Sequence, residues 1–272
     1  MLNFYRAATT VAGPAAGALL LWRASRGKED LSRLGERFGR TSALRPLGVL
    51  VWVHAASVGE SLSVLPLVER MLNALPNGHV LVTTGTLSSA RLLHDLLPER
   101  AFHHFVPIDR PDAVRRFLDH WRPELAVWVE SELWPNLVRA THLRQIPTVL
   151  LQGRMSAKSH RNWRWARSLI KPLLAGFSQV LVQTQADASR FRDLGAIQPV
   201  VTGTLKYAGF PLSAKETALR EMQSVLGART RWLAASIHPG EFETVYQTHV
   251  QVRESFPDLL TIIVPRHPST AF

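Results

Sequence analysis

Residues 48–65 read GVLVWVHAASVGESLSVL, and this stretch decides the predicted fold. The apolar run 48–55 is typical of a buried strand, and a turn of small residues follows at 56–60. From Leu62 to Leu75 apolar residues then recur at helical spacing. A strand that passes through a short turn into a helix begins a βαβ unit, so we expect a parallel sheet.

The same alternation of strand and helix continues as far as Gly203. Further strands are expected at 79–84, 102–106, 125–129, 148–152, 180–183 and 200–202, with helices at 88–97, 112–121, 135–143, 162–174 and 185–194. Short apolar strands separated by helices predict a parallel sheet that is covered on both faces. The fold class is therefore α/β, with a first Rossmann-like block of seven strands.

A second block begins after a linker-like segment, 207–213, which contains glycine and proline breakers. We expect a helix at 215–226, a strand at 232–235, a helix at 241–255 and a strand at 259–264. The turn His238–Glu241 stands in the same place as 57–60, between a first strand and its helix. Because only two strands precede Phe272, we expect this second Rossmann-like domain to be only begun and the chain to be truncated at its C-terminus.

The charge of the chain is strongly basic and unevenly distributed. The formal net charge is +11, and no acidic residue occurs from Leu133 to Ala186. This stretch carries Arg139, Arg144, Arg154, Lys158, Arg161, Arg164, Arg167 and Lys171. Such a field attracts nucleic acid, anionic lipid or a phosphorylated substrate, unless it is a solvated helix face beside acidic neighbours. The absence of cysteine excludes disulfides, thiolate zinc sites and a cysteine nucleophile.

The N-terminal segment, 1–27, is apolar at its centre. Residues 7–22 carry no charge, but sixteen residues fall short of the roughly 20 that span a bilayer. Arg23, Arg26 and Lys28 follow the apolar run, which argues against a cleaved signal peptide and favours a cytoplasmic location for the rest. We interpret the segment as a membrane-associating helix, with an ordinary buried helix as the alternative.

Polar residues that follow strands are the candidate site residues, because ligands of open parallel sheets bind beyond the carboxyl ends of the strands. Glu60 opens the helix after the first strand, and Glu130 and Glu132 follow the strand 125–129. Glu60 could accept a proton from a hydroxyl or simply complement the helix dipole. The carboxylate pair could also form part of a metal-binding site, but the sequence has no histidine cluster or Asp-x-Asp motif that would supply further ligands.

Cations lie near the boundary between the two blocks. Lys206 ends the first block, and Arg266 with His267 follows the last strand. Arginine grips phosphate or carboxylate through two parallel hydrogen bonds, so these residues suit an anionic substrate, although a solvated lysine is an equal alternative for Lys206. The chain has no Walker loop, Gly-x-Ser-x-Gly elbow, His-Glu-x-x-His motif or Gly-x-Gly-x-x-Gly fingerprint.

Seven short motifs, taken in order, resemble the 3-deoxy-D-manno-octulosonic acid (Kdo) transferase family, which acts in lipopolysaccharide synthesis. They are GERFG at 35–39, HAASVGE at 54–60, ESELWPN at 130–136, GRMS at 153–156, GTLK at 203–206, HPGE at 238–241 and VPRHP at 264–268. Each is weak alone, but together they cover essentially the whole chain. The resemblance implies a GT-B glycosyltransferase with an acceptor-binding domain, 28–206, and a donor-binding domain that begins at 207.

The resemblance also implies a reaction: inverting, metal-independent transfer of Kdo from CMP-Kdo to a lipid A precursor, lipid IVA. It would occur at the cytoplasmic face of a Gram-negative inner membrane, without cofactor or nucleic acid. The implied catalytic residues are Glu60 as proton acceptor, with Glu130 and Lys206 stabilising the transition state. The implied donor-binding residues are Pro265, Arg266, His238, Gly240 and Glu241, and the implied acceptor-binding residues are Ser57, Gly59 and Arg154.

The chain departs from the family pattern at three places. Gln152-Gly153-Arg154 stands where the family usually has Asn-Ala-Arg, and Tyr207-Ala208 where it has Phe-Asp. Family members also continue well beyond residue 272, so we expect a longer sequence to complete the donor site. Three other functions stay open at this point: another GT-B nucleotide-sugar enzyme, a non-catalytic membrane-surface protein that binds anionic lipid, and a nucleic-acid binder.

Overall fold

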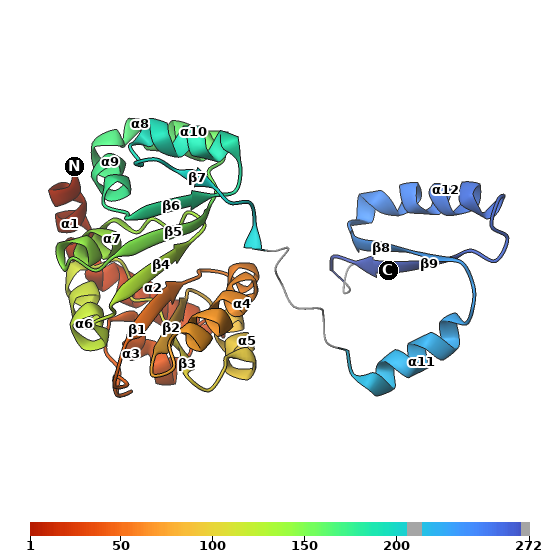
Figure 1. Cartoon of the computed structure of the whole chain (residues 1–272), viewed down its shortest axis with the longest axis horizontal. Helices are drawn as coiled ribbons and strands as arrows, with labels where there is room; N and C mark the ends of the chain where they lie inside the picture. The colour runs from red at the N-terminus through yellow and green to blue at the C-terminus, as the bar shows by residue number, and fades with distance from the viewer. Residues whose placement is uncertain (206–213, 268–272) are drawn as a thin grey trace. The chain divides into compact units, whose positions relative to one another are not determined.

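The computed structural model of the chain describes residues 1–205 and 214–267. Contacts along the backbone divide the chain into two units, Met1–Phe210 and Pro211–Phe272, which are drawn in Figure 1. Lys206 and the predicted linker 207–213 lie outside the described residues.

The first unit is built on a seven-stranded sheet. Its strands are β1 (Leu50–His54), β2 (His79–Thr84), β3 (Ala101–Phe105), β4 (Leu125–Val129), β5 (Thr148–Gly153), β6 (Gln179–Val182) and β7 (Val200–Val201). Their order is β3-β2-β1-β4-β5-β6-β7, and every neighbouring pair is parallel. This confirms the predicted sheet. The chain reverses its direction of travel between β1 and β4, which is where ligands bind in sheets of this order.

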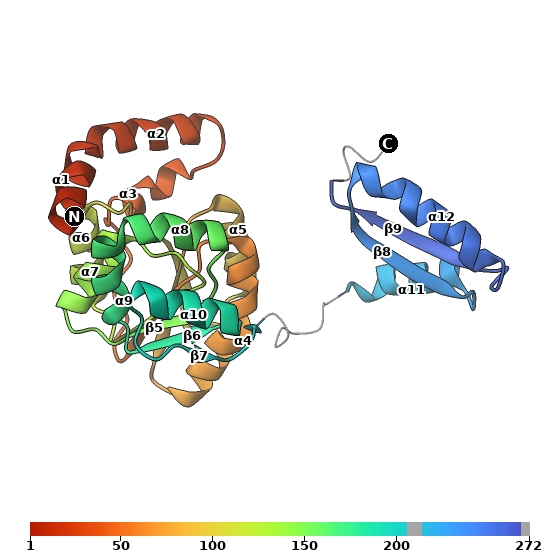
Figure 2. The same cartoon turned by 90° about the horizontal axis from the view of Figure 1, so that it is seen from above.

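Helices cover both faces of this sheet (Figures 1 and 2). They are α4 (Val58–Ala74), α5 (Leu87–Leu96), α6 (Pro111–Trp121), α7 (Pro135–Leu143), α8 (Ala157–Trp165), α9 (Arg167–Ala175) and α10 (Gln185–Leu194). Successive strand residues point to opposite faces. Leu50 and Trp52 therefore pack in the core beneath α6, α7, α9 and α10, whereas Val51 and Val53 pack in the core beneath α4 and α5.

One predicted helix, 162–174, is wrong. The structure has two helices there, α8 and α9, which meet at Ala166 (φ −104°, ψ 29°). The first begins at Ala157 because the Ser156 hydroxyl accepts a hydrogen bond from the Ser159 N–H at 3.0 Å and caps the helix. The cap, rather than the apolar pattern, sets where the helix starts.

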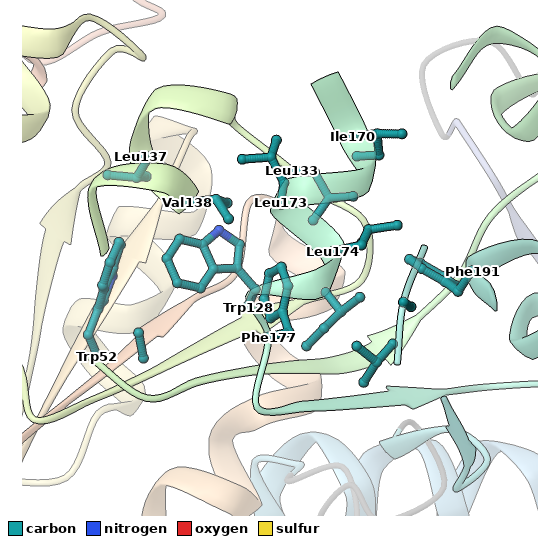
Figure 3. Close-up of a cluster of buried hydrophobic side chains, with 14 of the residues drawn as sticks. Trp52, Trp128, Leu133, Leu137, Val138, Ile170, Leu173, Leu174, Phe177 and Phe191 are labelled. Carbon is teal, nitrogen blue, oxygen red and sulfur yellow. The ribbon is translucent and has the colours of Figure 1, made fainter. Parts of the chain in front are cut away.

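Tryptophans fill the larger core (Figure 3). The rings of Trp52 and Trp128, from the neighbouring strands β1 and β4, lie edge to face with their centroids 4.7 Å apart. Phe117 of α6 packs on Trp52 at 5.0 Å, and Phe177 packs on Trp128 at 6.0 Å. Fully buried aromatic pairs of this kind hold β1 and β4 at a fixed separation, and with them the residues that follow these strands.

The N-terminal segment forms two helices, α1 (Leu2–Val11) and α2 (Gly13–Ser25), rather than the single helix predicted. Pro14 lies in the first turn of α2, where its missing N–H costs nothing. A Cβ at Gly13 would lie 2.5 Å from the Arg110 guanidinium, so a larger residue at this corner would displace that flexible side chain. No helix among the described residues is long and apolar enough to cross a membrane.

The GERFG motif, 35–39, joins this N-terminal segment to the sheet. Arg37, in the short helix α3 (Leu34–Arg37), pairs with the buried Glu29 carboxylate at 2.9 Å and donates to the Gly85 carbonyl at 2.7 Å. Glu36 accepts a hydrogen bond from the Phe105 N–H at 2.7 Å. The motif therefore has a structural role: it fastens the segment to the ends of β2 and β3. A 3₁₀ turn (Leu31–Arg33) precedes it.

The second unit contains one βαβ motif preceded by a helix. Its elements are α11 (Glu216–Leu226), β8 (Arg231–Ile237), the 3₁₀ turn η3 (Pro239–Glu241), α12 (Phe242–Arg253) and β9 (Leu260–Pro265). The strands β8 and β9 pair in parallel, as predicted. Leu233, Ile263 and Val264 on these strands remain exposed within the described part of the chain.

Candidate active site

The turn between β1 and α4 holds Glu60 in a fixed position. Ser57 caps α4, and its hydroxyl donates a hydrogen bond to Glu60 Oε1 at 2.8 Å. The Ala56 N–H donates to Glu60 Oε2, also at 2.8 Å. Glu60 is only 8% exposed. A Cβ built on Gly59 would meet no heavy atom of the described residues within 4 Å, so the backbone beside the carboxylate borders open space.

The environment of Glu60 favours its protonated form. Burial raises the pKa of the Glu60 carboxyl, and the negative charges of Glu130 and Glu132 raise it further. The hydrogen bonds from Ser57 and Ala56 oppose this shift, because they stabilise the carboxylate. A carboxylate with a raised pKa binds a proton more strongly than an ordinary one, as a general base near neutral pH must.

The segment that follows β4 contains the other two acids. Glu130 has a left-handed backbone (φ 60°), and its N–H bonds to the Leu151 carbonyl of β5 at 2.8 Å. Glu132 accepts a hydrogen bond from Trp134 Nε1 at 2.8 Å. Residues other than glycine rarely adopt a positive φ. Those that do are concentrated at functional sites, where the surrounding structure maintains the strained backbone. The structure thus places Glu60, Glu130 and Glu132 beyond neighbouring strands at one edge of the sheet.

Gln152, at the end of β5, connects three segments at this same edge. It also has a positive φ, 56°, and is 1% exposed. Its side-chain nitrogen donates to Ser63 Oγ of α4 at 3.1 Å. Its side-chain oxygen accepts from Thr204 Oγ1 at 2.9 Å and from the Leu205 N–H at 3.0 Å. Gln152 therefore fastens residues 204–205, immediately before Lys206, to the helix that carries Glu60.

In the sequence Gln152 stands out only as a departure from the family pattern, and its connecting role is not among the predicted site roles. The signal was available, because Gln152 is a polar residue at the end of a buried strand, as is Glu130. His54, by contrast, belongs to the core: burial lowers its pKa to about 4, and its Nδ1 lies 3.0 Å from Thr83 Oγ1. The histidine of the HAASVGE motif is thus neutral near pH 7.

The predicted acceptor residues Ser57, Gly59 and Arg154 lie at the same edge of the sheet. The side chain of Arg154 is exposed, and its carbonyl accepts a hydrogen bond from the Ser131 hydroxyl after β4. A cavity of about 650 Å³ lies between the C-terminal end of α2, the segment 27–33 and α5. The Gly85 N–H, two residues before α5, bonds to the Ala56 carbonyl at 3.2 Å and so connects the start of α5 to the Glu60 turn.

The acid-free stretch 133–186 is partly neutralised by acids from elsewhere in the first unit. Arg144 pairs with Asp119 at 2.5 Å, and Arg167 pairs with Asp193 at 3.3 Å. Within the described residues, five cations of the stretch have no acidic partner within 4 Å: Arg139, Arg154, Lys158, Arg161 and Lys171. The basic field is therefore weaker than the sequence suggests, but it persists.

The predicted donor residues gather at the corresponding edge of the second unit. Glu241 accepts a hydrogen bond from the His238 N–H at 2.9 Å, and the rings of His238 and His267 have centroids 6.3 Å apart. Arg266, directly after Pro265, bonds through its N–H to the Ile237 carbonyl at 2.9 Å. A Cβ at Gly240 would meet no described heavy atom within 4 Å. The remaining predicted catalytic residue, Lys206, lies outside the described residues.

Metal-ligating side chains do not cluster in the described ranges 1–205 and 214–267: no group of three His, Cys, Asp or Glu side chains there could hold an ion.

Known structures share the fold of this chain. A UDP-GlcNAc 2-epimerase from Neisseria meningitidis bound to UDP-GlcNAc matches with a TM-score of 0.56 and 11% identity, covering 81% of this chain and 67% of that one. Another UDP-N-acetylglucosamine 2-epimerase matches with a TM-score of 0.51 and 12% identity, covering 78% of this chain and 62% of that one. At such low identity these matches speak for the fold alone, and they confirm the predicted α/β, GT-B-type fold class.

Curated relatives are much closer in sequence. The chain is 38% identical over 98% of its length to the "Probable 3-deoxy-D-manno-octulosonic acid transferase, mitochondrial" of Arabidopsis thaliana, covering 61% of that protein. It is 34% identical to the 3-deoxy-D-manno-octulosonic acid transferase of Rickettsia bellii, covering 89% of this chain and 58% of that protein. It is 32% identical to the Haemophilus influenzae enzyme of the same name, covering 87% of this chain and 56% of that protein.

These matches cover about three fifths of the length of the relatives. The family model described as "3-Deoxy-D-manno-octulosonic-acid transferase (kdotransferase)" matches residues 32–209, which include the whole seven-stranded sheet and the Glu60 turn. The chain therefore belongs to the Kdo transferase family of glycosyltransferases.

Proposed function

We propose that this protein transfers Kdo from CMP-Kdo to a hydroxyl of a lipid A precursor, lipid IVA, with inversion at the anomeric carbon. The observation that carries the proposal is Glu60: a buried carboxylate with a raised pKa, held by two hydrogen bonds where the strand order reverses. Residues 28–206 form the acceptor-binding domain, and residues from 207 onward begin the donor-binding domain.

In the proposed reaction Glu60 acts as the general base. Its carboxylate takes the proton from the acceptor hydroxyl while the hydroxyl oxygen forms a bond to the anomeric carbon of Kdo. The bond from that carbon to the phosphate oxygen breaks, and CMP leaves with the electron pair. Because attack and departure occur on opposite faces of the sugar, the configuration inverts.

The hydrogen bonds of Glu60 support this role geometrically. Ser57 and Ala56 occupy one hydrogen-bonding position on each carboxylate oxygen, which fixes the carboxylate plane. Each ionised carboxylate oxygen can accept a further hydrogen bond, so Oε1 or Oε2 can still accept the substrate proton. A positioned base within hydrogen-bonding distance contributes typically 10²–10⁴-fold to the rate.

Charge development in the transition state explains the other proposed catalytic residues. Departure of the phosphate leaves positive charge on the sugar ring, which the Glu130 carboxylate would stabilise. Lys206 would stabilise negative charge on the leaving phosphate or on the sugar carboxylate. Pro265 and Arg266 would hold the cytidylate, together with the turn His238, Gly240 and Glu241.

The acceptor is proposed to approach over the N-terminal helices. The side chains of Phe4 and Val11 on α1 are 80% and 81% exposed. In contrast, Tyr5 and Thr9 on the same helix make hydrogen bonds to the rest of the first unit. A helix that turns its polar residues inward and its apolar residues outward suits a membrane surface. We place the protein on the cytoplasmic face of a bacterial inner membrane, where the cavity between α2 and α5 would admit the lipid headgroup.

The experiment that tests the proposal compares Glu60→Gln with Glu69→Gln in the full-length protein. Both residues lie on α4, but Glu69 is exposed. Transfer is followed by CMP release and by the mass of the lipid product. We expect Glu60→Gln to lose transfer while binding vesicles normally, and Glu69→Gln to keep both. Full transfer by Glu60→Gln would refute the mechanism.

A second measurement separates this function from the alternatives. Saturation-transfer NMR with CMP and UDP as competing ligands should show a preference for CMP, whereas a preference for UDP would indicate a different nucleotide-sugar enzyme. A non-catalytic lipid-binding protein would release no CMP with any acceptor.

A further inference from the structure

A cavity of about 310 Å³ lies between α1, α6 and α7 of the first unit, apart from the Glu60 turn. Three arginines line it, one from each neighbouring segment: Arg6 of α1, Arg115 of α6 and Arg144 at the end of α7. The rest of its wall includes the apolar side chains of Val114, Ala140 and Leu143.

The charge of this cavity is positive and largely uncompensated. Its one carboxylate among the described lining residues, Asp112, is already paired with Arg110 at 2.7 Å and with Arg116 at 3.0 Å. Arg144 is paired with Asp119. Arg6 and Arg115, in contrast, have no acidic partner within 4 Å in the described part of the chain. Two free guanidinium groups around one space fit a phosphate, which they bind through paired hydrogen bonds.

The position of the cavity indicates where that phosphate comes from. Arg6 directly follows Tyr5, whose hydroxyl donates to Asp109 at 2.9 Å and fixes this side of α1 against the first unit. The opposite side of α1 exposes Phe4 and Val11 to solvent. If that apolar side enters a membrane, the cavity lies at the depth of the lipid headgroups, where phosphates are concentrated. The cavity and the apolar side thus lie on two sides of the same helix, α1, so the orientation of α1 on a membrane determines the position of both.

We propose that this cavity binds the phosphate of an anionic membrane phospholipid and thereby sets the orientation of α1 on the bilayer. The proposal rests on the membrane-surface part of the proposed function, but it assigns a second lipid site that takes no part in transfer. Val114, Ala140 and Leu143 suit the glycerol and first methylene groups that follow the phosphate.

The test uses the full-length protein and vesicles that contain no lipid A precursor. Co-sedimentation is measured with phosphatidylcholine alone and with phosphatidylcholine containing about one quarter phosphatidylglycerol. The double variant Arg6→Gln/Arg115→Gln should bind the anionic vesicles about 30-fold more weakly, since each basic residue at such a surface contributes about fivefold.

Arg70→Gln/Arg192→Gln is the matched control, because it removes the same charge from exposed positions on α4 and α10. We expect it to change binding to the anionic vesicles by less than about fivefold. Phe4→Ser should weaken binding to both kinds of vesicle, because it removes an apolar contact and no charge. Thermal melting of each variant verifies that it is folded.

Three outcomes would overturn the proposal. Equal losses in the two double variants would mean that net charge, not this cavity, attracts the membrane. Unchanged binding by Arg6→Gln/Arg115→Gln would exclude the site. If Arg6→Gln/Arg115→Gln no longer bound glycerol phosphate in an NMR titration but still bound vesicles normally, the cavity would be assigned to a soluble phosphate. Glu60→Gln should bind vesicles like the unmodified protein, so failure of the catalytic mechanism is seen separately.

Discussion

Two strand-to-helix turns of this chain hold a glutamate in nearly the same way, one in each unit. In the first unit the Ala56 N–H donates to Glu60 Oε2 at 2.8 Å, and in the second the His238 N–H donates to Glu241 Oε2 at 2.9 Å. In both turns the glutamate stands at the third position of the helical segment and satisfies a backbone donor. The local geometry alone therefore does not distinguish a candidate base from an ordinary helix cap.

The surroundings of the two turns make the difference. Glu60 is buried beside β4, whose following residues bring Glu130 and Glu132 close enough to raise the Glu60 pKa. Glu241 is exposed, at the end of a described sheet of two strands. A helix cap acquires the properties of a base only where neighbouring strands remove water and add charge. The variants below test this contrast, beginning with the largest expected effect.

The first test shortens each glutamate by one methylene group. Glu60→Asp keeps the charge but withdraws the carboxylate by about 1.5 Å. We expect the rate of Kdo transfer to fall by about 100-fold, because a misplacement near 1 Å can have this effect on a reacting group. Glu241→Asp should leave kcat nearly unchanged and act on the donor KM. Equal losses of kcat in both variants would remove the distinction between the two turns.

Much of the fold follows from the sequence alone. The strands β2 and β4 begin and end at the predicted residues, 79–84 and 125–129, because each is a short apolar run bounded by polar or breaking residues. The helix predicted at 162–174 is wrong because the pattern of apolar residues runs across the break at Ala166. A break in helical backbone leaves no mark in a pattern that records only polarity.

The site could be predicted only in part. The rule that ligands bind beyond the carboxyl ends of parallel strands placed Glu60 and Glu130 at one edge, where the structure has them, although their chemical roles stay predictions. The position of Gln152 at the end of a buried strand marks it as a candidate, but its contacts to Ser63 and Thr204 depend on the tertiary fold, so its connecting role could not be predicted. Its positive φ is equally invisible in the sequence, because glutamine has no preference for that conformation.

The second test removes the cap of each turn. Ser57→Ala deletes the hydroxyl that caps α4 and donates to Glu60, so we expect it to destabilise α4 by about 1 kcal/mol. His238→Ala acts on the exposed three-residue turn η3, and we expect a smaller loss there. Native-state hydrogen exchange, followed on peptides from α4 and α12, measures both in one experiment. A larger increase in the exchange rate of α12 after His238→Ala than of α4 after Ser57→Ala would reverse the expected order.

The third test concerns the acids beside Glu60. Glu130→Gln and Glu132→Gln each remove a negative charge that raises the Glu60 pKa, and Glu130 is the stronger of the two. The rising limb of kcat/KM against pH, which reports the base of the free enzyme, should therefore move to lower pH in both variants and further in Glu130→Gln. The position of the limb is the readout, because Glu130 is also expected to affect the maximal rate. A limb that stays in place would show that the three carboxylates do not interact.

The smallest effect is on the stability of the buried turn itself. Because the folded-state pKa of Glu60 is raised, the unfolded chain loses this proton at lower pH than the folded chain does. The unmodified protein is therefore progressively destabilised as the pH rises from the unfolded pKa to the folded pKa. Glu60→Gln removes this titration, so its melting temperature relative to the unmodified protein should rise with pH from the ordinary pKa of a glutamate up to the raised pKa of the folded state, and then level off. The gain should shrink when Glu130→Gln is already present, since part of the repulsion is then gone. A stability difference that is constant with pH would mean that the two hydrogen bonds to Glu60 cancel the effect of burial, and the carboxylate would then resemble an ordinary helix cap.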